Sequence, residues 1–187
     1  KTVLTFRAEL IWKFRQGVID RSSEIIDICI NEAGKTKPDA EAELDRAVQA
    51  LTHVAGVQHF YPTHFSQNVA GGIDIADLRF PIGVVAGVGP FNFPILIPIL
   101  HSAMALVTGN TYIAKPSEKV PSISRLYADI YEDIGLPDGC FNVINGGKEI
   151  VEQLVRHEKV NGLAFIGSTV AAKSLKILGV EHNTKVQ

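Results

Sequence analysis

The stretch IGVVAGVGPFNFP, residues 82–94, decides the fold class. Its first seven residues are all aliphatic or glycine, which is the pattern of a strand buried on both faces. The prolines at positions 90 and 94 then interrupt regular structure, because proline lacks a backbone donor. Residues 95–108 carry no Lys, Arg, Asp or Glu and are typical of a buried helix. This order predicts one βα unit of a parallel sheet.

The same alternation continues downstream. Strands are predicted over residues 111–115, 141–144 and 162–167, and helices over residues 122–135, 148–157 and 169–179. Residues 80–187 therefore predict a doubly wound, Rossmann-like parallel sheet within the α/β class. Upstream, residues 1–59 show helical spacing of apolar residues, with Gly34 ending one helix and Pro38 beginning the next. Residues 60–79 are rich in turn residues and predict a strand-forming arm or hairpin.

Composition excludes several classes of protein. The 187 residues are 46% hydrophobic and 20% charged, with a formal charge of -2, so no basic surplus indicates nucleic-acid binding. The uncharged run from Phe80 to Ala114 is long enough for a membrane span, but its prolines favour a buried strand, turn and helix instead. Six histidines show no metal-ligand spacing, so no metal is expected, and two cysteines fit a reducing compartment.

Ligands of open parallel sheets bind at the carboxyl ends of strands, so the loops at residues 89–94, 115–119, 145–149 and 167–171 are the candidate site. Each loop also has a purely structural interpretation. Asn92 either donates to an oxygen that becomes negative during a reaction or satisfies its own turn. Lys115 and Glu118 either grip a sugar diol, or form a solvated lysine and a helix cap. Gly147 fits a tight turn or a close approach to a nucleotide, and Ser168 fits an N-cap or a phosphate site.

Three motifs in a fixed order add a resemblance. PFNFP (90–94), GNTYIAKPSE (109–118) and FIGST (165–169) resemble the aldehyde dehydrogenase superfamily, and EAGKTKPDAEAELDRA (32–47) extends the likeness upstream. The resemblance is strongest to the methylmalonate-semialdehyde, CoA-acylating branch. It implies the nicotinamide cofactor NAD. The positions that match cofactor-binding residues of the family are Phe91, Lys115, Pro116, Ser117, Glu118, Gly147, Gly167 and Ser168.

The resemblance also implies roles in chemistry. Asn92 matches the amide that donates to the oxygen of a cysteine thiohemiacetal, and Arg46 matches an arginine that binds the carboxylate of the substrate. An alternative for Arg46 is an ordinary charge on the surface of a helix. The carboxylate of Glu118 would repel a 2′-phosphate, which favours NAD over NADP.

The catalytic cysteine of the family lies beyond residue 187, so we expect the catalytic domain to be absent and this chain alone to be inactive. The complete enzyme is expected to oxidise a (methyl)malonate-semialdehyde-like aldehyde to an acyl-CoA, as a homo-oligomer in the cytoplasm or mitochondrial matrix. One alternative is a non-catalytic nucleotide-binding or interaction module without the nucleophile. Another is an unrelated doubly wound domain that binds a different phosphate ligand.

Overall fold

The protein is described by a computed structural model, which covers residues 2–61 and 63–187. Positions 1 and 62, which fall in the segments 1–59 and 60–79 discussed above, lie outside the described residues. The helices are α1 (Leu4–Asp20), α2 (Ser22–Ala33), α3 (Lys37–Ala55), the 3-10 helix η1 (Val57–His59), α4 (Leu96–Val107), α5 (Ser122–Asp133), α6 (Lys148–Arg156) and α7 (Thr169–Glu181). The strands are β1 (Phe65–Ala70), β2 (Ile73–Ala76), β3 (Val84–Val88), β4 (Thr111–Lys115), β5 (Phe141–Val143), β6 (Val160–Phe165) and β7 (Lys185–Val186).

A five-stranded parallel sheet forms the centre of the molecule, in the order β5-β4-β3-β6-β7. Residues 82–94 supply the central strand of this sheet, β3, which pairs with β4 on one side and β6 on the other. The chain therefore builds the sheet outward from β3 in one direction and then returns to build it in the other. This arrangement confirms the predicted α/β fold class.

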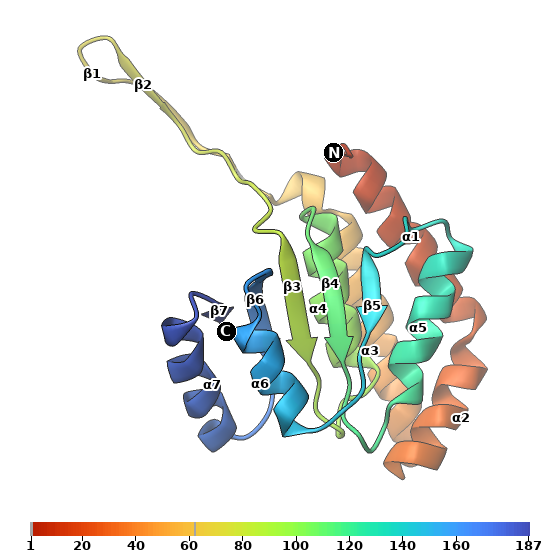
Figure 1. Ribbon diagram of the computed structural model, residues 1–187. Coiled ribbons are helices and arrows are strands. Elements are labelled where there is room, and N and C mark those ends of the chain that lie inside the picture. Colours follow the sequence, from red (N-terminus) through yellow and green to blue (C-terminus); the bar gives the residue numbers. More distant parts are fainter. Residues whose placement is uncertain (1, 62) are drawn as a thin grey trace.

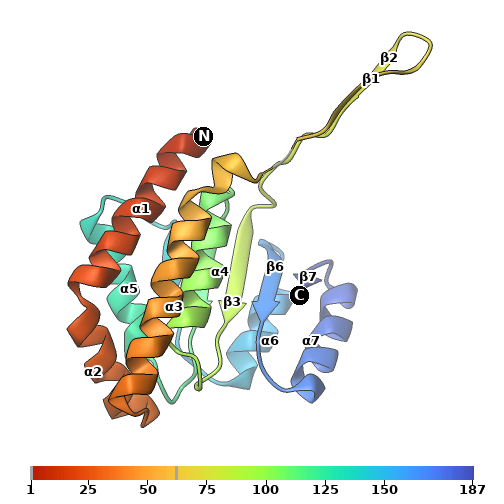
Figure 2. The same cartoon turned by 180° about the vertical axis from the view of Figure 1, so that it is seen from behind.

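Helices cover both faces of the sheet (Figures 1 and 2). Helices α4 and α5 lie on one face, and α1, α2 and α3 pack outside them as a further layer. Helices α6 and α7 lie on the other face, over a smaller apolar core that includes Val88, Leu154 and Leu163. Parallel strands covered on both faces account for the continuous apolar run of β3.

Aromatic packing joins the outer helical layer to the inner one. Phe14 of α1 is fully buried and stacks on Tyr131 of α5 with ring centroids 3.8 Å apart. The edge of Tyr127 meets the same Phe14 ring at 5.7 Å. Helices α1–α3 thus share one hydrophobic core with α4 and α5.

A carboxylate from the outer layer also caps α5. Glu32 of α2 accepts a hydrogen bond from the Ser122 amide at 3.1 Å and another from the Ser122 hydroxyl. The residue before α5, Pro121, provides no side-chain cap of its own. The first turn of α5 therefore depends on a group 90 positions earlier in the chain.

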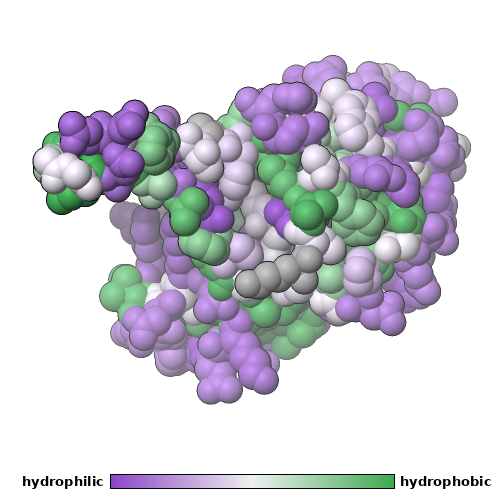
Figure 3. Space-filling view, turned by 90° about the horizontal axis from the view of Figure 1, so that it is seen from above, coloured by the Kyte–Doolittle hydropathy of each residue, from purple (hydrophilic) through white to green (hydrophobic). Residues whose placement is uncertain are grey.

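Strands β1 and β2 form an antiparallel hairpin that projects away from the body (Figure 1). Gly72 adopts a left-handed φ of 79° at its tip, a conformation that glycine permits without a Cβ clash. Large apolar side chains are exposed along the hairpin and its base, and Figure 3 shows them beside hydrophilic ones. They are Phe65, Val69, Ile73, Ile75, Leu78, Phe80 and Ile82.

The uncharged run after the hairpin is divided as the prolines suggested, between β3, a turn and α4. Within residues 2–61 and 63–187, none of the helices combines the length and the apolar composition that crossing a bilayer requires.

Candidate functional site

The carboxyl ends of β3, β4 and β6 meet at one edge of the sheet and, together with α6 and α7, line an open cavity of about 570 Å³. Backbone hydrogen bonds hold the three loops together there, since the Gly89 amide donates to Lys115 O at 3.2 Å and the Ile166 amide donates to Val88 O at 3.3 Å. The order of the sheet reverses between β3 and β6, so the cavity lies at the topological switch point where open α/β sheets bind ligands. Its volume falls in the range of small-molecule sites.

The cavity brings together most of the residues that the sequence singled out. The predicted residues that line it are Phe91, Lys115, Ser117, Glu118, Gly167 and Ser168. Residues that the prediction missed also line it, among them Lys148 and Glu152 of α6 and Val170 and Ser174 of α7. Lys148 and Val170 fall within the candidate loops 145–149 and 167–171, whereas the only signal for Glu152 and Ser174 was their place in the helices that follow these loops.

Lys115 is the most unusual of these residues because it is only 4% exposed. Its ammonium lies 3.4 Å from the carboxylate of Glu118, whose side chain is 57% exposed. The interpretation of Lys115 as an ordinary solvated lysine is therefore wrong. The backbone amide of Glu118 itself, and secondarily Lys115, lower the pKa of the Glu118 carboxyl, so it is charged at neutral pH.

The helix α7 begins beside the same cavity. Ser168 is its N-cap, and the serine hydroxyl oxygen accepts a hydrogen bond from the Ala171 amide at 3.3 Å. Gly167 lies against the ring of Phe165, where an added Cβ would come within 2.5 Å of Cζ. The loop can therefore follow this path only with a residue as small as glycine, unless the ring moves. The N-terminus of α7 presents a partial positive charge to the cavity.

Asn92 lies in the turn between β3 and α4, next to Phe91 at the edge of the cavity. Its side chain makes no hydrogen bond to the described residues, so the structure gives no support to its satisfying its own turn. The two rings that flank Asn92 are partly open to solvent, since Phe91 and Phe93 are 50% and 38% exposed. The Lys119 ammonium lies 4.5 Å from the centre of the Phe91 ring and covers part of it.

Besides Asn92, three predicted residues lie outside the lining of the cavity. Pro116 follows Lys115 and shapes the loop. Gly147 is the N-cap of α6, and its amide donates to the Glu149 carboxylate at 3.0 Å, as expected for a tight strand-to-helix turn. Arg46 lies on the exposed side of α3, in agreement with its alternative as a surface charge.

Neither cysteine belongs to the cavity. Cys29 is fully buried on α2, and burial together with the nearby Glu43 carboxylate raises its pKa to about 11. Cys140 is half-buried and lines a separate pocket beside α1. Over the described parts of the chain, His, Cys, Asp and Glu residues form no group of three or more that could hold a metal ion.

The sequence model of the aldehyde dehydrogenase family matches residues 1–187 of this chain. The chain belongs to the aldehyde dehydrogenase family. The matched region contains the motifs PFNFP, GNTYIAKPSE and FIGST, and the predicted resemblance is confirmed.

Relatives of this aldehyde dehydrogenase chain include semialdehyde enzymes. It is 33% identical over 187 residues to a malonate-semialdehyde dehydrogenase of Bacillus pumilus, and it covers 38% of that protein. It is 34% identical over 186 residues to the acylating mitochondrial methylmalonate-semialdehyde/malonate-semialdehyde dehydrogenase of Bos taurus, of which it covers 35%. These matches cover 100% of this chain, so the likeness to the methylmalonate-semialdehyde branch is confirmed, while the chain spans well under half of each relative.

Solved structures share the fold closely. A Sinorhizobium meliloti 1021 protein described as a methylmalonate-semialdehyde dehydrogenase, in complex with NAD, superposes with a TM-score of 0.94 at 34% identity. The match covers 99% of this chain and 38% of that one. The aldehyde dehydrogenase fold is thus present over the entire described chain.

Proposed function

We propose that the full-length protein carrying this chain is an NAD-dependent aldehyde dehydrogenase that oxidises a malonate- or methylmalonate-semialdehyde-like aldehyde to an acyl-CoA. One observation carries the proposal. A single cavity at the strand ends gathers Phe91, Lys115, Glu118 and Ser168 in a chain that matches semialdehyde dehydrogenases along its whole length. The relative solved with NAD supports the choice of cofactor.

The residues of the cavity fit a dinucleotide. The buried Lys115 ammonium and the Glu118 carboxylate offer a donor and an acceptor to the hydroxyl groups of a ribose. The N-terminus of α7, with Gly167 and Ser168, suits a pyrophosphate. Bound NAD supplies the hydride acceptor of the reaction. In this proposal Phe91 and Ser117 contact the cofactor, while Pro116 and Gly147 shape the loops around it.

Asn92 carries the chemical role of this chain in the proposal. The aldehyde carbon is attacked by a cysteine thiolate from outside residues 1–187, and the side-chain N–H of Asn92 donates to the oxygen that becomes negative. Cys29 is unsuited to be that nucleophile, because it is buried and its pKa is raised to about 11. The guanidinium of Arg46 is proposed to bind the carboxylate of the semialdehyde.

The substitution Asn92→Ala tests the function. In the full-length protein it is expected to lower kcat by about 10²–10³, because one oxyanion donor is lost from the transition state. The Kd of NAD is expected to stay within about twofold, because the cavity residues are unchanged. NADH formation with malonate semialdehyde and CoA gives kcat, and fluorescence titration gives Kd. An unchanged kcat would remove Asn92 from the reaction, and no NADH formation by the unsubstituted protein would reject the dehydrogenase itself.

A nucleotide-binding module without its own chemistry is the second candidate. The observation in its favour is that the whole cavity lies within this chain, whereas neither Cys29 nor Cys140 lines that cavity. Calorimetric titration of the 187-residue chain with NAD tests it. Saturable binding without turnover by the full-length protein supports this candidate, and the absence of binding rejects it.

The hairpin β1–β2 supports the further proposal of a homo-oligomer. Its exposed apolar side chains project beyond the body, where a second copy could cover them. A reducing compartment, either the cytoplasm or the mitochondrial matrix, is proposed because both cysteines are free, and the bovine relative is named mitochondrial.

A further inference from the structure

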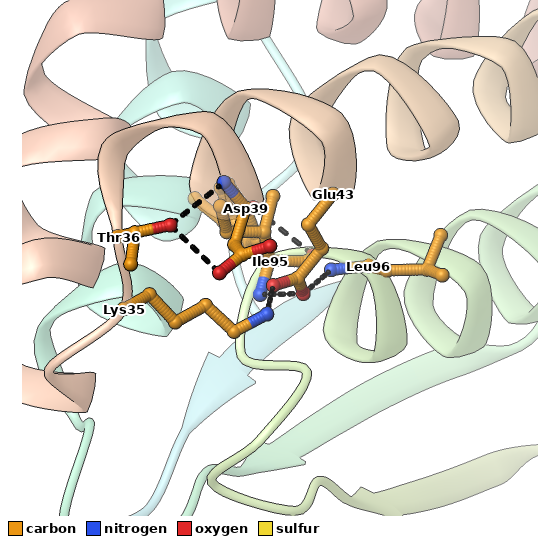
Figure 4. Close-up of polar contacts among 7 residues, drawn as sticks. Lys35, Thr36, Asp39, Glu43, Ile95 and Leu96 are labelled. Atoms are coloured by element: carbon orange, nitrogen blue, oxygen red, sulfur yellow. Dashed lines mark hydrogen bonds and ion pairs between the residues drawn. The ribbon is translucent and has the colours of Figure 1, made fainter.

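The turn that carries Asn92 is followed at once by α4, and a partly buried ion pair from a distant part of the chain holds the start of that helix (Figure 4). Glu43 of α3 is only 3% exposed. One oxygen of its carboxylate accepts hydrogen bonds from the Ile95 and Leu96 amides, both at 2.8 Å. The other oxygen accepts from the Lys35 ammonium at 2.6 Å. Both oxygens of the carboxylate are therefore engaged.

The start of α4 has little other support from its own sequence. Its N-cap residue, Ile95, has no side-chain group that could cap a helix. Pro94 and Pro98 supply no amide donors, and the Ile97 amide already donates to Phe93 O at 3.3 Å. The first-turn amides without a backbone acceptor are thus those of Ile95 and Leu96, and both donate hydrogen bonds to Glu43. A negative charge at a helix N-terminus is also favoured by the helix dipole.

Because both first-turn amides already donate to Glu43, they limit what the loop before α4 can bind. An uncapped helix N-terminus is a ready anion site, but here the amides of Ile95 and Leu96 are already used. The start of α4 therefore has no free donor to offer a substrate oxygen. Among the side chains of residues 90–96, that of Asn92 is the one that carries a polar donor.

Two further contacts restrain the same segment. The Lys35 ammonium lies 4.8 Å from the centre of the Phe93 ring, next to Asn92 in the chain. The hydroxyl of Tyr127 donates to Ile95 O at 3.1 Å. Groups from α3 and α5 thus hold the backbone of Ile95 and Leu96, and a group from the loop before α3 contacts the ring of Phe93.

We propose that Lys35 and Glu43 are positioning residues for Asn92. Glu43 fixes the start of α4 through the Ile95 and Leu96 amides, while Lys35 balances its charge and restrains Phe93. Together they set where the Asn92 amide points. The inference rests on the proposed oxyanion role of Asn92 and adds that the role depends on a pair more than 45 residues earlier in the sequence. Neither Lys35 nor Glu43 lines the cavity at the carboxyl ends of β3, β4 and β6.

The main test is Glu43→Gln in the full-length protein, which keeps the shape of the side chain and removes its charge. Glu41→Gln is the matched control, because Glu41 lies on the same helix in an exposed pair with Lys37 at 3.9 Å. We expect Glu43→Gln to lower kcat with malonate semialdehyde by about 10- to 100-fold, a fraction of the effect of losing the donor itself. The Kd of NAD and the kinetics of the control should change by less than about twofold.

A double variant separates positioning from a general loss of structure. If Glu43 acts through Asn92, adding Glu43→Gln to Asn92→Ala lowers kcat no further, because the positioned group is already gone. Hydrogen exchange of the Ile95 and Leu96 amides gives a readout that does not depend on activity, and we expect exchange at least tenfold faster in Glu43→Gln. Should Glu43→Gln fail to fold, Phe93→Leu removes the Lys35–ring contact and leaves the Glu43 hydrogen bonds in place. It should lower kcat severalfold, again without a further loss in the Asn92→Ala background.

The outcomes distinguish this inference from the proposed function. Unchanged exchange at Ile95 and Leu96, or additive losses of kcat in the double variants, would overturn the positioning role while Asn92→Ala still shows its own effect. An unchanged kcat in Asn92→Ala would overturn the oxyanion role first, and the positioning role with it. Faster exchange together with non-additive losses of kcat would support the inference.

Discussion

Gly87 in the central strand β3 is the position where the structure makes its sharpest prediction of stability. A Cβ added to Gly87 would lie 1.8 Å from the hydroxyl oxygen of Tyr112 and 2.6 Å from Cζ of the same ring. An ordinary contact needs at least 3.4 Å, so ring or strand must move by about 1.6 Å. Tyr112 is only 1% exposed, and β3 is paired on both sides. Burial of the ring and pairing of the strand on both sides therefore oppose this movement.

We therefore expect Gly87→Ala to lower the free energy of unfolding by about 3 kcal/mol, the upper part of the range for overpacked cores. For a chain of this size that corresponds to a fall in Tm of roughly 6–12 °C. Urea and thermal unfolding of the 187-residue chain, followed by far-ultraviolet circular dichroism, measure both quantities. Gly89→Ala is the matched control, because its added Cβ would meet its nearest neighbour, Cγ of Pro98, at an ordinary 3.7 Å.

A second variant links the effect to Tyr112. Combining Gly87→Ala with Tyr112→Leu removes the ring, so the double variant should be less destabilised than the sum of the two single variants by at least about 1 kcal/mol. The reasoning is refuted if Gly87→Ala unfolds within about 0.5 kcal/mol of the unsubstituted chain, or if the two changes are additive.

Three other predictions follow from the site and its surroundings. Glu118→Gln is expected to weaken the binding of NAD more than the binding of NADP in fluorescence titrations. The change removes an acceptor for the ribose hydroxyls, and it also removes a charge that repels the 2′-phosphate of NADP. Equal losses of affinity for both cofactors would contradict the ribose contact. Burial lowers the pKa of His101 from 6.5 to about 4. Between these two pH values the unfolded chain binds more protons than the folded chain. The free energy of unfolding should therefore rise with pH across this range, by at most about 3 kcal/mol. His101→Leu should flatten that dependence in urea unfolding, and an unchanged slope would place the titrating group elsewhere. Phe65→Ser with Ile75→Ser on the hairpin should reduce the mass seen by light scattering of the full-length protein, whereas an unchanged mass would remove the hairpin from the interface.

Local signals in the sequence predicted the elements well. The strand predicted at residues 111–115 is β4 without change, because an apolar run between Gly109 and Pro116 is unambiguous. Gly34 ends α2 with a left-handed φ of 67°, and Pro38 lies in the first turn of α3. Such positions are fixed by the backbone preferences of single residues, which the sequence states directly.

Other features depend on pairing and could not be read locally. The strand predicted at 162–167 lies at Val160–Phe165, because register with β3 decides where the strand ends and the loop to α7 begins. The two-residue strand β7 was missed, since it exists only through its pairing with β6. Boundaries of this kind are set by neighbours, whereas the apolar pattern shows only that a strand is near.

The candidate site also combines features that the local sequence predicts with features that depend on distant contacts. The rule that ligands bind at strand ends was enough to select Lys115, Glu118 and Ser168, which line one cavity. It could not reveal that Lys115 is buried, since burial depends on the loops packed around it. Nor could it single out Glu43, whose partners lie 52 and 53 residues away.

The two caps that cross the molecule also bear on how the chain folds. Helices α4 and α5 have 12 residues each and lack side-chain caps of their own, so alone in water each is marginal. Each gains its cap only when a carboxylate from the first 59 residues docks against it. Secondary and tertiary structure therefore form together, over loops that are slow to close. Residues 1–59 and 80–187 should unfold as one cooperative unit, and a cut between them should leave two pieces that are each largely unfolded until they are mixed.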